Sequence, residues 1–320
     1  MSIPFVKGQM GGNRIALLDG RAVPEERYVD QALRALAPEV LHGHQAGWLL
    51  PAAEPDHVRV RVVSISWRDF IPACGGLTQV LGHALVCSPA AGWVGLHPGA
   101  SPWTVTIDYD AWPVPLHVTH EGTAARRVDA DLSAFVHDCR TRGIRPLTLM
   151  GHPAYQVGTF LVLDADTVRE LRPDADVSGL DETTRQDLLR IHREFHHQTG
   201  LESWDFALYD WGASGDRDLR VVFPHALPIH HVEPACGTGS VALAVALVES
   251  GAAREHGLVP EDGRLRLRLE SGGAPVLGGP ETTTVNLSVQ EDRVTGVTFF
   301  HDRVTLTAIG ELPFPPVLTL

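Results

Sequence analysis

The tetrapeptide Pro-Ala-Cys-Gly occurs twice, at residues 72–75 and 234–237, in a chain that has only four cysteines. The two cysteines of the repeat, Cys74 and Cys236, lie 162 residues apart in a chain of 320 residues. At this shift further residues coincide: Leu81 with Leu243, and Ala84-Leu85-Val86 with Ala246-Leu247-Val248. A repeat at about half the chain length predicts two structurally related halves.

Each copy of the repeat predicts a strand, a turn and a helix. The strands are "HVRVRVVSISW" (57–67) and "DLRVVF" (218–223), in which apolar and polar residues alternate. After Cys74, apolar residues recur with the spacing of one helix face: Leu77, Val80, Leu81, Ala84 and Leu85. After Cys236, "SVALAVALV" (240–248) is apolar on all sides, which is typical of an enclosed helix. We therefore expect each cysteine at a helix N-terminus.

A cysteine at a helix N-terminus has useful chemistry. The free N–H groups and the helix dipole are expected to lower the thiol pKa from about 8.5 and to bind a carboxylate. Glycines let a ligand approach the backbone closely. The candidate binding residues next to the cysteines are Gly75, Gly76, Gly237, Thr238 and Gly239. If both helices face one pocket, one thiolate removes a proton from carbon and the opposite thiol delivers one, which inverts a stereocentre.

The alternative for a single buried cysteine is a small apolar side chain that only packs. We assign this packing role to Cys87 and Cys139, which lie outside the repeat. For Cys74 and Cys236 we favour catalysis, because both occur in the repeated motif.

Charge and composition exclude several classes of partner. The chain has 39 acidic and 26 basic residues, a net charge of −13 and no dense run of Lys or Arg. Nucleic acid and anionic membranes are therefore not expected partners. No apolar run reaches the roughly 20 residues of a membrane helix, and neither a signal peptide nor a disulfide framework is recognisable. We expect a cytoplasmic protein with reduced thiols.

The sequence predicts neither a cofactor nor a metal. It has no phosphate-binding G-x-x-x-x-G-K-[ST] loop and no strand-linked G-x-G-x-x-G. Lys7 is the only lysine, and nothing around it suggests a pyridoxal phosphate Schiff base. Neither repeated cysteine lies in a C-x-x-C, which disfavours zinc. The expected partner is a small amino acid or related carboxylic acid, and a homodimer is left open.

Two stretches resemble the diaminopimelate epimerase family. "PACGTGSVALAVAL" is similar to its second cysteine motif, A-C-G-T-G, and "FVKGQMGGNRIALLDG" (5–20) is similar to its opening. "HGHQAGWLL" (42–50) and the closing "VTGVTFFHDRVTLTAIGEL" (294–312) are looser matches. The resemblance implies an α+β fold of two pseudo-symmetric halves, each a mostly antiparallel sheet wrapped around a central helix. It also implies cofactor-independent two-base racemisation by Cys74 and Cys236, with Asn13 and Gln45 in the substrate pocket.

The departures from the family concern the substrate. Gly76 stands where the family has Asn, and His152 stands at a pocket Asn position of the second half. Leu227 and Pro228 replace a Glu-Arg pair that holds the far end of diaminopimelate. The resemblance therefore implies that diaminopimelate is not the substrate.

Other pocket candidates and the domain limits follow from the same positions. His231 and Glu233 precede Cys236 closely; an exposed loop histidine and a helix-capping carboxylate are the alternatives. The predicted halves are residues 1–140 completed by 303–320, and residues 141–302. Three functions remain: an amino-acid racemase or epimerase, an isomerase that shifts a proton in an unsaturated or cyclic carboxylic acid, and a non-catalytic carboxylate-binding protein.

Overall fold

The fold is taken from a computed structural model of the whole chain. The structure describes residues 2–171, 173, 190, 191, 193, 194, 197, 198, 200, 205–213, 215–225, 231–233, 235–271 and 281–313.

The chain forms two compact units. Unit 1 consists of Met1–Ala130 and Val304–Leu320, and unit 2 consists of Asp131–Arg303. The predicted boundary after residue 140 falls within the helix α4 (Ser133–Arg142) of unit 2.

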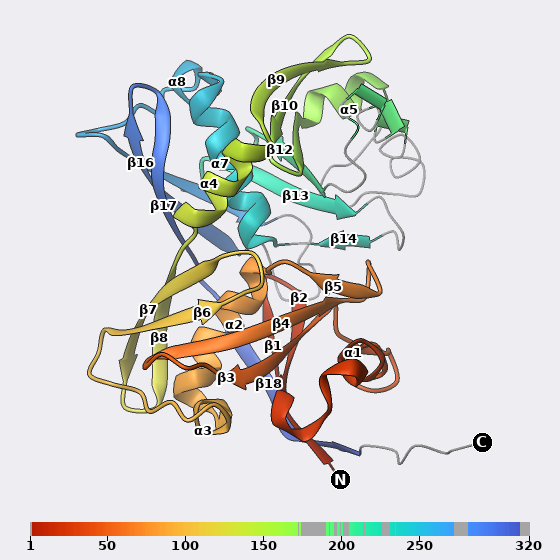
Figure 1. Cartoon of the computed structure of the whole chain (residues 1–320). Helices are drawn as coiled ribbons and strands as arrows, with labels where there is room; N and C mark the ends of the chain where they lie inside the picture. The colour runs from red at the N-terminus through yellow and green to blue at the C-terminus, as the bar shows by residue number, and fades with distance from the viewer. Residues whose placement is uncertain are drawn as a thin grey trace. The chain divides into compact units, whose positions relative to one another are not determined.

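Unit 1 is built on a mixed sheet (Figure 1). Its strands pair in the order β18-β1-β2-β3-β4-β6-β7-β8, and β5 pairs with β4. The β2–β3 and β4–β6 pairs are parallel, and the other pairs are antiparallel. The bounds are β1 Ser2–Met10, β2 Asn13–Asp19, β3 Gln45–Pro51, β4 His57–Ser64, β5 Asp69–Ile71, β6 Trp103–Asp108, β7 Pro113–Glu121, β8 Ala124–Asp131 and β18 Val304–Pro313.

One helix of unit 1, α2 (Gly75–Cys87), packs against β1, β2, β7 and β18. Two glycines permit this close packing. A Cβ at Gly8 of β1 would lie 2.7 Å from a methyl carbon of Val80, and one at Gly47 of β3 would lie 2.5 Å from a methyl carbon of Leu77. The apolar stripe predicted from the sequence is buried, because Leu77, Val80, Leu81, Ala84 and Leu85 all lie in the core.

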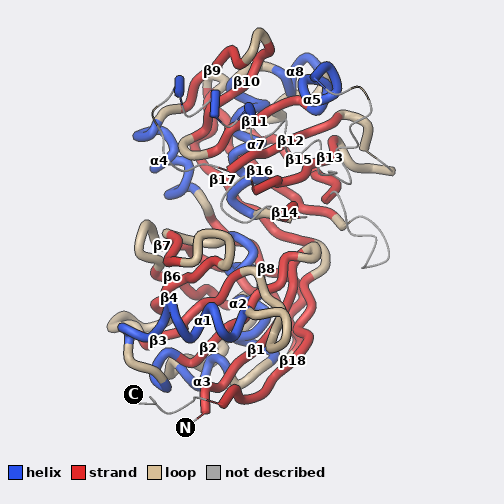
Figure 2. Tube along the Cα trace, turned by 90° about the vertical axis from the view of Figure 1, so that its right-hand side faces the viewer, coloured by secondary structure: helices blue, strands red, loops and turns tan. Residues whose placement is uncertain are grey.

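A second core of unit 1 lies under α1 (Tyr28–Leu36), which packs on β3 and β4 (Figure 2). Trp48 and Tyr28 stack there with ring centroids 4.5 Å apart. Alternate residues of β3 therefore contact different helices: Gly47 faces α2, and Trp48 faces α1. The short helices of unit 1 are η1 Gly20–Ala22, η2 Glu25–Arg27 and α3 Ala90–Trp93.

Unit 2 is built on a second mixed arrangement of strands. The pairing order is β9-β10-β11-β12-β13-β15-β16-β17, with β14 paired to β13; β11–β12 and β13–β15 are parallel, and the other pairs are antiparallel. The bounds are β9 Ile144–Leu149, β10 His152–Val157, β11 Phe160–Asp164, β12 Asp205–Asp210, β13 Leu219–His225, β14 His231–Glu233, β15 Arg264–Ser271, β16 Thr282–Gln290 and β17 Arg293–His301.

The helix α7 (Gly237–Glu249) is the buried helix of unit 2. It packs against β10, β11, β12, β16 and β17, and against α4 and α8. Every residue from Gly239 to Val248 is buried, so the prediction of an enclosed helix is confirmed. The remaining helices are α5 Ala165–Leu171 and α8 Ala252–Glu255.

The predicted local elements agree with the structure: β4 and β13 occupy the two predicted strand segments, and helices begin directly after Cys74 and Cys236. The fold is a mixed α/β architecture with many strands and few helices. Within the described part of the chain, no helix has both the length and the apolar character needed to cross a membrane.

Candidate active site

Cys74 is the N-cap residue of α2 and is almost fully buried, with 7% of its surface exposed. Its backbone is extended (φ −148°, ψ 116°), and the N–H of Leu77 donates a hydrogen bond to its sulfur at 3.4 Å. This N–H is one of the unpaired donors of the first helical turn. The side chain therefore takes the place of a capping Ser or Asp, and its sulfur lies where backbone donors stabilise negative charge.

Two hydroxyl groups hold the backbone of Cys74. Thr78 Oγ1 donates a hydrogen bond of 2.9 Å to the Cys74 carbonyl oxygen, and the Tyr109 hydroxyl donates one of 3.2 Å to the same oxygen. The two hydroxyl oxygens are themselves 2.9 Å apart. Both side chains are buried, so these bonds form where water does not compete, and they fix the start of α2.

Asn13 lies beside the start of α2. It is fully buried at the first position of β2, and its Oδ1 is 3.1 Å from His44 Nδ1. A Cβ at Gly76 would lie 3.1 Å from the Asn13 Nδ2 atom. The structure therefore brings together Asn13 and Gly76, two of the residues that the sequence proposed for one pocket.

Gln45 is the first residue of β3 and is buried, with 4% exposure. Because side chains alternate along a strand and Gly47 faces α2, Gln45 lies on the α2 side of the sheet. Cys74, Gly75, Gly76, Asn13 and Gln45 thus all belong to the α2 side of unit 1.

Cys236 is the N-cap residue of α7 and is partly buried, with an extended backbone (φ −132°, ψ 121°). Thr238 Oγ1 lies 3.5 Å from its sulfur. Gly237 is the first residue of α7 and is buried. Glu233, the last residue of β14, is buried with 3% exposure, and its negative charge raises the pKa of the Cys236 thiol.

The expectation that a helix N-terminus lowers the thiol pKa is wrong for Cys236. Burial, and next the negative charge of Glu233, raise the pKa of Cys236 well above its usual value, and Asp205 acts in the same direction. Hydrogen bonds from Thr238 and from the backbone N–H of Gly239 lower the pKa, but by less. A helix dipole contributes about 0.3–1 kcal/mol at most sites. Desolvation shifts a pKa by as much as about 3–5 units, each worth about 1.4 kcal/mol, and so outweighs the dipole.

The two helix starts differ in detail. Gly239 permits close packing, because a Cβ there would lie 2.5 Å from a ring carbon of Phe223 and 3.2 Å from one of Phe160. Ser240, at the position that Thr78 has in α2, is fully buried, and its Oγ has no hydrogen-bond partner among the described residues. The Cys236 backbone therefore lacks the hydroxyl support that Cys74 has from Thr78.

The remaining sequence candidates have mixed outcomes. His152, the first residue of β10, is partly exposed, and its Nδ1 lies 2.7 Å from a carboxylate oxygen of Glu170. His231 begins β14, but its side chain lies outside the described residues, as do Leu227 and Pro228.

Of the two cysteines assigned to packing, only Cys139 has that role. It is buried in α4, and burial raises its pKa to about 12. The assignment is wrong for Cys87, which is exposed at the last position of α2, where the Ala125 N–H of β8 donates a hydrogen bond to its sulfur at 3.3 Å.

Sequence reasoning missed Tyr109 and Asp205. A signal existed for Tyr109, because Trp103, Val105, Ile107 and Tyr109 alternate as the inward positions of β6 and its extension, and all are buried. For Asp205, the first residue of β12, no local signal existed, because its effect on Cys236 depends on the tertiary fold.

No protein-family model matches the chain, and no curated protein sequence matches it. Solved structures do match. A hydroxyproline epimerase from Agrobacterium vitis with bound trans-4-hydroxy-L-proline has a TM-score of 0.64 at 14% identity, covering 97% of this chain and 92% of that one. A probable proline racemase from Agrobacterium radiobacter, with bound carbonate, has a TM-score of 0.65 at 13% identity, covering 99% and 94%.

A methylitaconate-delta-isomerase has a TM-score of 0.60 at 14% identity, covering 98% of this chain and 95% of that one. At these identities the likeness establishes the fold. The chain therefore shares its fold with a hydroxyproline epimerase, a probable proline racemase and an isomerase.

Proposed function

We propose that the protein is a cofactor-independent amino-acid racemase or epimerase that inverts a carbon next to a carboxylate with two cysteines. One observation carries the proposal: Cys74 and Cys236 each cap the N-terminus of a buried helix, in the two copies of one repeated motif. A purely structural role requires neither the thiols nor their repetition.

We also propose that the two units are pseudo-symmetric halves. The order of strand pairing supports this, because the main order of eight strands in each unit, without β5 and β14, has the same pattern: antiparallel, antiparallel, parallel, antiparallel, parallel, antiparallel, antiparallel. The 13-residue helices α2 and α7 begin at Gly75 and Gly237, at the same spacing as the two cysteines. Two-base inversion requires the sulfurs of Cys74 and Cys236 to reach opposite faces of one substrate.

The reaction would proceed through two proton transfers. The thiolate of one cysteine takes the proton from the substrate carbon, and the electron pair of the C–H bond moves into the adjacent carboxylate. The other cysteine donates its thiol proton to the opposite face of the carbon. Inversion leaves the first cysteine protonated and the second ionised, ready for the reverse direction.

The environments of the two sulfurs support different resting states. The raised pKa of Cys236 favours the protonated thiol, so Cys236 would be the proton donor in the resting enzyme. The other cysteine, Cys74, would then be the base, and the Leu77 N–H directed at its sulfur would stabilise the thiolate once it forms. The backbone N–H groups at the start of each helix would hold the substrate carboxylate and stabilise the charge that develops on it.

The charge next to Cys236 supports an amino-acid substrate. Glu233 is buried and Asp205 is partly buried, and both raise the pKa of the Cys236 thiol, so this part of unit 2 carries negative potential. An α-ammonium or a protonated ring nitrogen would be attracted there, whereas a second carboxylate would be repelled. We infer that the substrate carries one carboxylate and one positively charged nitrogen.

An isomerase that shifts a proton in an unsaturated carboxylic acid is the second candidate. The fold match to the methylitaconate-delta-isomerase favours it. A proton shift requires the same pair of acid and base and does not require a nitrogen. The two candidates differ in the product: racemisation inverts the α-carbon, and the proton shift moves a double bond.

The proposal is tested by incubating the protein in D2O with three groups of compounds: linear amino acids, ring amino acids of the proline type, and unsaturated mono- and dicarboxylic acids. Proton NMR detects loss of a C–H signal, and chiral chromatography detects inversion. We expect inversion with deuterium at the α-carbon of an amino acid. Exchange limited to unsaturated acids would support the second candidate instead, and binding without exchange would support a carboxylate-binding protein.

The exposed Cys87 provides the matched control. Cys74→Ala and Cys236→Ala are each expected to abolish inversion, whereas Cys87→Ala removes a thiol from the same chain and is expected to leave the rate unchanged. Equal activity of Cys74→Ala and Cys87→Ala would refute the proposed role of Cys74.

A further inference from the structure

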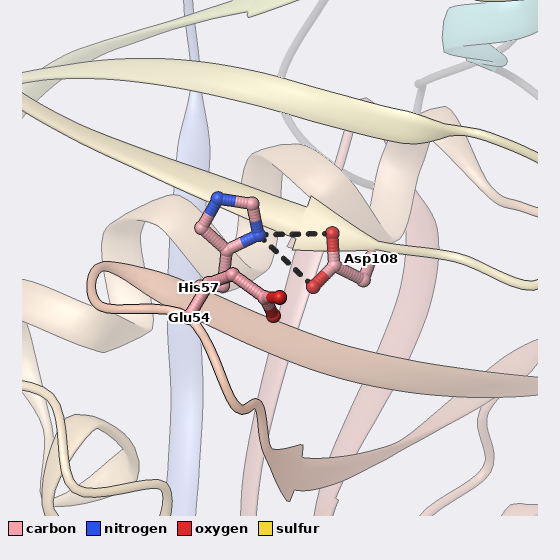
Figure 3. Close-up of side chains that lie close together, drawn as sticks. All are labelled: Glu54, His57 and Asp108. Carbon is pink, nitrogen blue, oxygen red and sulfur yellow. Dashed lines mark hydrogen bonds and ion pairs between the residues drawn. The ribbon is translucent and has the colours of Figure 1, made fainter.

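A cluster of three side chains lies in unit 1 outside the candidate active site. Glu54, in the turn before β4, His57, the first residue of β4, and Asp108, the last residue of β6, each offer a ligand atom, and these atoms all lie within 4.8 Å of one another. Figure 3 shows the carboxylates of Glu54 and Asp108 close together beside the imidazole of His57. We propose that these residues form a binding site for a divalent transition-metal ion of the Zn²⁺ type.

The donor set selects the class of ion. One imidazole nitrogen and two carboxylate oxygens suit Zn²⁺ and its neighbours, whereas Mg²⁺ and Ca²⁺ favour sites made of oxygen alone. Ligands around a tetrahedral Zn²⁺ lie about 3.4 Å apart at bond lengths of about 2.0–2.2 Å. The three ligand atoms, which lie within 4.8 Å of one another, therefore need to move only a short way toward a bound ion. Because the three residues are partly or fully exposed, water can complete the coordination.

The charge of the cluster favours a cation. Asp108 contacts His57 through both carboxylate oxygens, at 3.1 and 3.0 Å from Nδ1. Within the described part of the chain, neither Glu54 nor Asp108 forms an ion pair with a lysine or an arginine. Two carboxylates thus lie beside one imidazole, and a divalent ion bound at Nδ1 would add two positive charges between them.

The backbone holds the three residues in place. The strands β4 and β6 are parallel neighbours, with His57 opposite Thr106 and Arg59 opposite Asp108. Two hydrogen bonds tie the turn to β6, because Thr106 N–H donates to the Asp56 carbonyl oxygen at 2.9 Å and Trp103 Nε1–H donates to Asp56 Oδ1 at 3.3 Å. A bound ion would cross-link the turn to the end of β6, and so stabilise unit 1 independently of the proposed catalysis.

The test is a Zn²⁺ titration of the full chain, after treatment with EDTA and dialysis, followed by calorimetry and thermal unfolding. We expect one equivalent of Zn²⁺ to bind and to raise the unfolding temperature. Changing an outer-shell residue alone weakens metal sites by about 10–100-fold, so His57→Ala and Asp108→Asn should weaken binding by at least about tenfold. His97→Ala and Glu39→Gln, which alter exposed residues elsewhere in unit 1, should leave it unchanged.

The thiols are competing zinc ligands, and Co²⁺ distinguishes them. A cobalt complex of His57 and the two carboxylates absorbs in the visible range without the near-ultraviolet band of a cobalt–thiolate bond. Cys74→Ala should leave the spectrum unchanged, and His57→Ala should remove it. Three outcomes would overturn the proposal: no binding, binding that persists in His57→Ala, or a thiolate band that disappears in Cys74→Ala. Since none of these readouts involves turnover, the test is independent of the proposed racemase.

Discussion

The Tyr109 hydroxyl donates a 3.2 Å hydrogen bond to the carbonyl oxygen of Cys74, the residue that caps α2. Burial, and next the charge of an ionised Cys74, raise the pKa of Tyr109 well above its usual value, so Tyr109 remains a donor throughout the physiological range. Tyr109 therefore positions the backbone from which the Cys74 thiol projects.

Replacing this hydroxyl tests the positioning role. Tyr109→Phe keeps the ring and removes the donor, so we expect kcat to fall about tenfold through a small displacement of Cys74, with little change in KM. Thr78→Val should act in the same direction. Ser240→Ala is the matched control, because Ser240 Oγ has no partner among the described residues and its removal should cost little. A purely structural role of Tyr109 would lower stability and leave kcat unchanged.

The raised pKa of Cys236 predicts how fast alkylating agents modify it. The thiolate is the reactive form, so at pH 7 Cys236 should react slowly with iodoacetamide, and the rate should rise with pH beyond the usual thiol pKa of about 8.5. Glu233→Gln removes one negative charge that favours the protonated thiol. Its pH profile should therefore shift toward lower pH.

Mass spectrometry of labelled peptides measures the rate, in a Cys87→Ser background that removes the exposed thiol. An unchanged profile in Glu233→Gln would show that Glu233 does not act on Cys236.

The contact between Gly239 and Phe223 predicts a loss of stability. In Gly239→Ala the new methyl group would overlap the ring of Phe223, and overpacking of this kind typically costs about 1–3 kcal/mol. Gly92→Ala is the control, because nothing lies within 4 Å of a Cβ at that helical position. Urea unfolding followed by fluorescence compares the two. Equal stability of both variants would contradict the close packing of α7 on β13.

The sequence predicted the local parts of the site for physical reasons. Helix periodicity after Cys74 and the apolar run after Cys236 are local signals, and both helices begin where they were expected. Pairings between distant segments have no such signal. Asp205 and Glu233 both raise the pKa of Cys236, and the pairing of β12, β13 and β14 brings them near it. Burial of the thiol has the largest effect, and it raises the pKa where the sequence predicted a lower one.

The residues expected at the far end of the substrate pocket predict which amino acids the protein accepts. The resemblance to the diaminopimelate epimerase family implies that Leu227 and Pro228 replace a Glu-Arg pair, so a distal ammonium and carboxylate would lose their partners. Diaminopimelate should therefore have a kcat/KM at least about 100-fold below that of the best mono-amino acid. Parallel measurements on a panel of amino acids decide this, and diaminopimelate as the best substrate would contradict the predicted pocket.

The isotope content of the first product formed in D2O tests the two-base claim most directly. Starting from one enantiomer, the reaction is stopped at a few per cent conversion, and mass spectrometry reads deuterium in the product and in the unreacted substrate separately. Two cysteines acting on opposite faces predict a product that carries one solvent deuterium, while the remaining substrate keeps its proton. Product that retains the original proton, or deuterium that enters the substrate at the same rate as the product, would indicate a single base and would contradict the paired roles of Cys74 and Cys236.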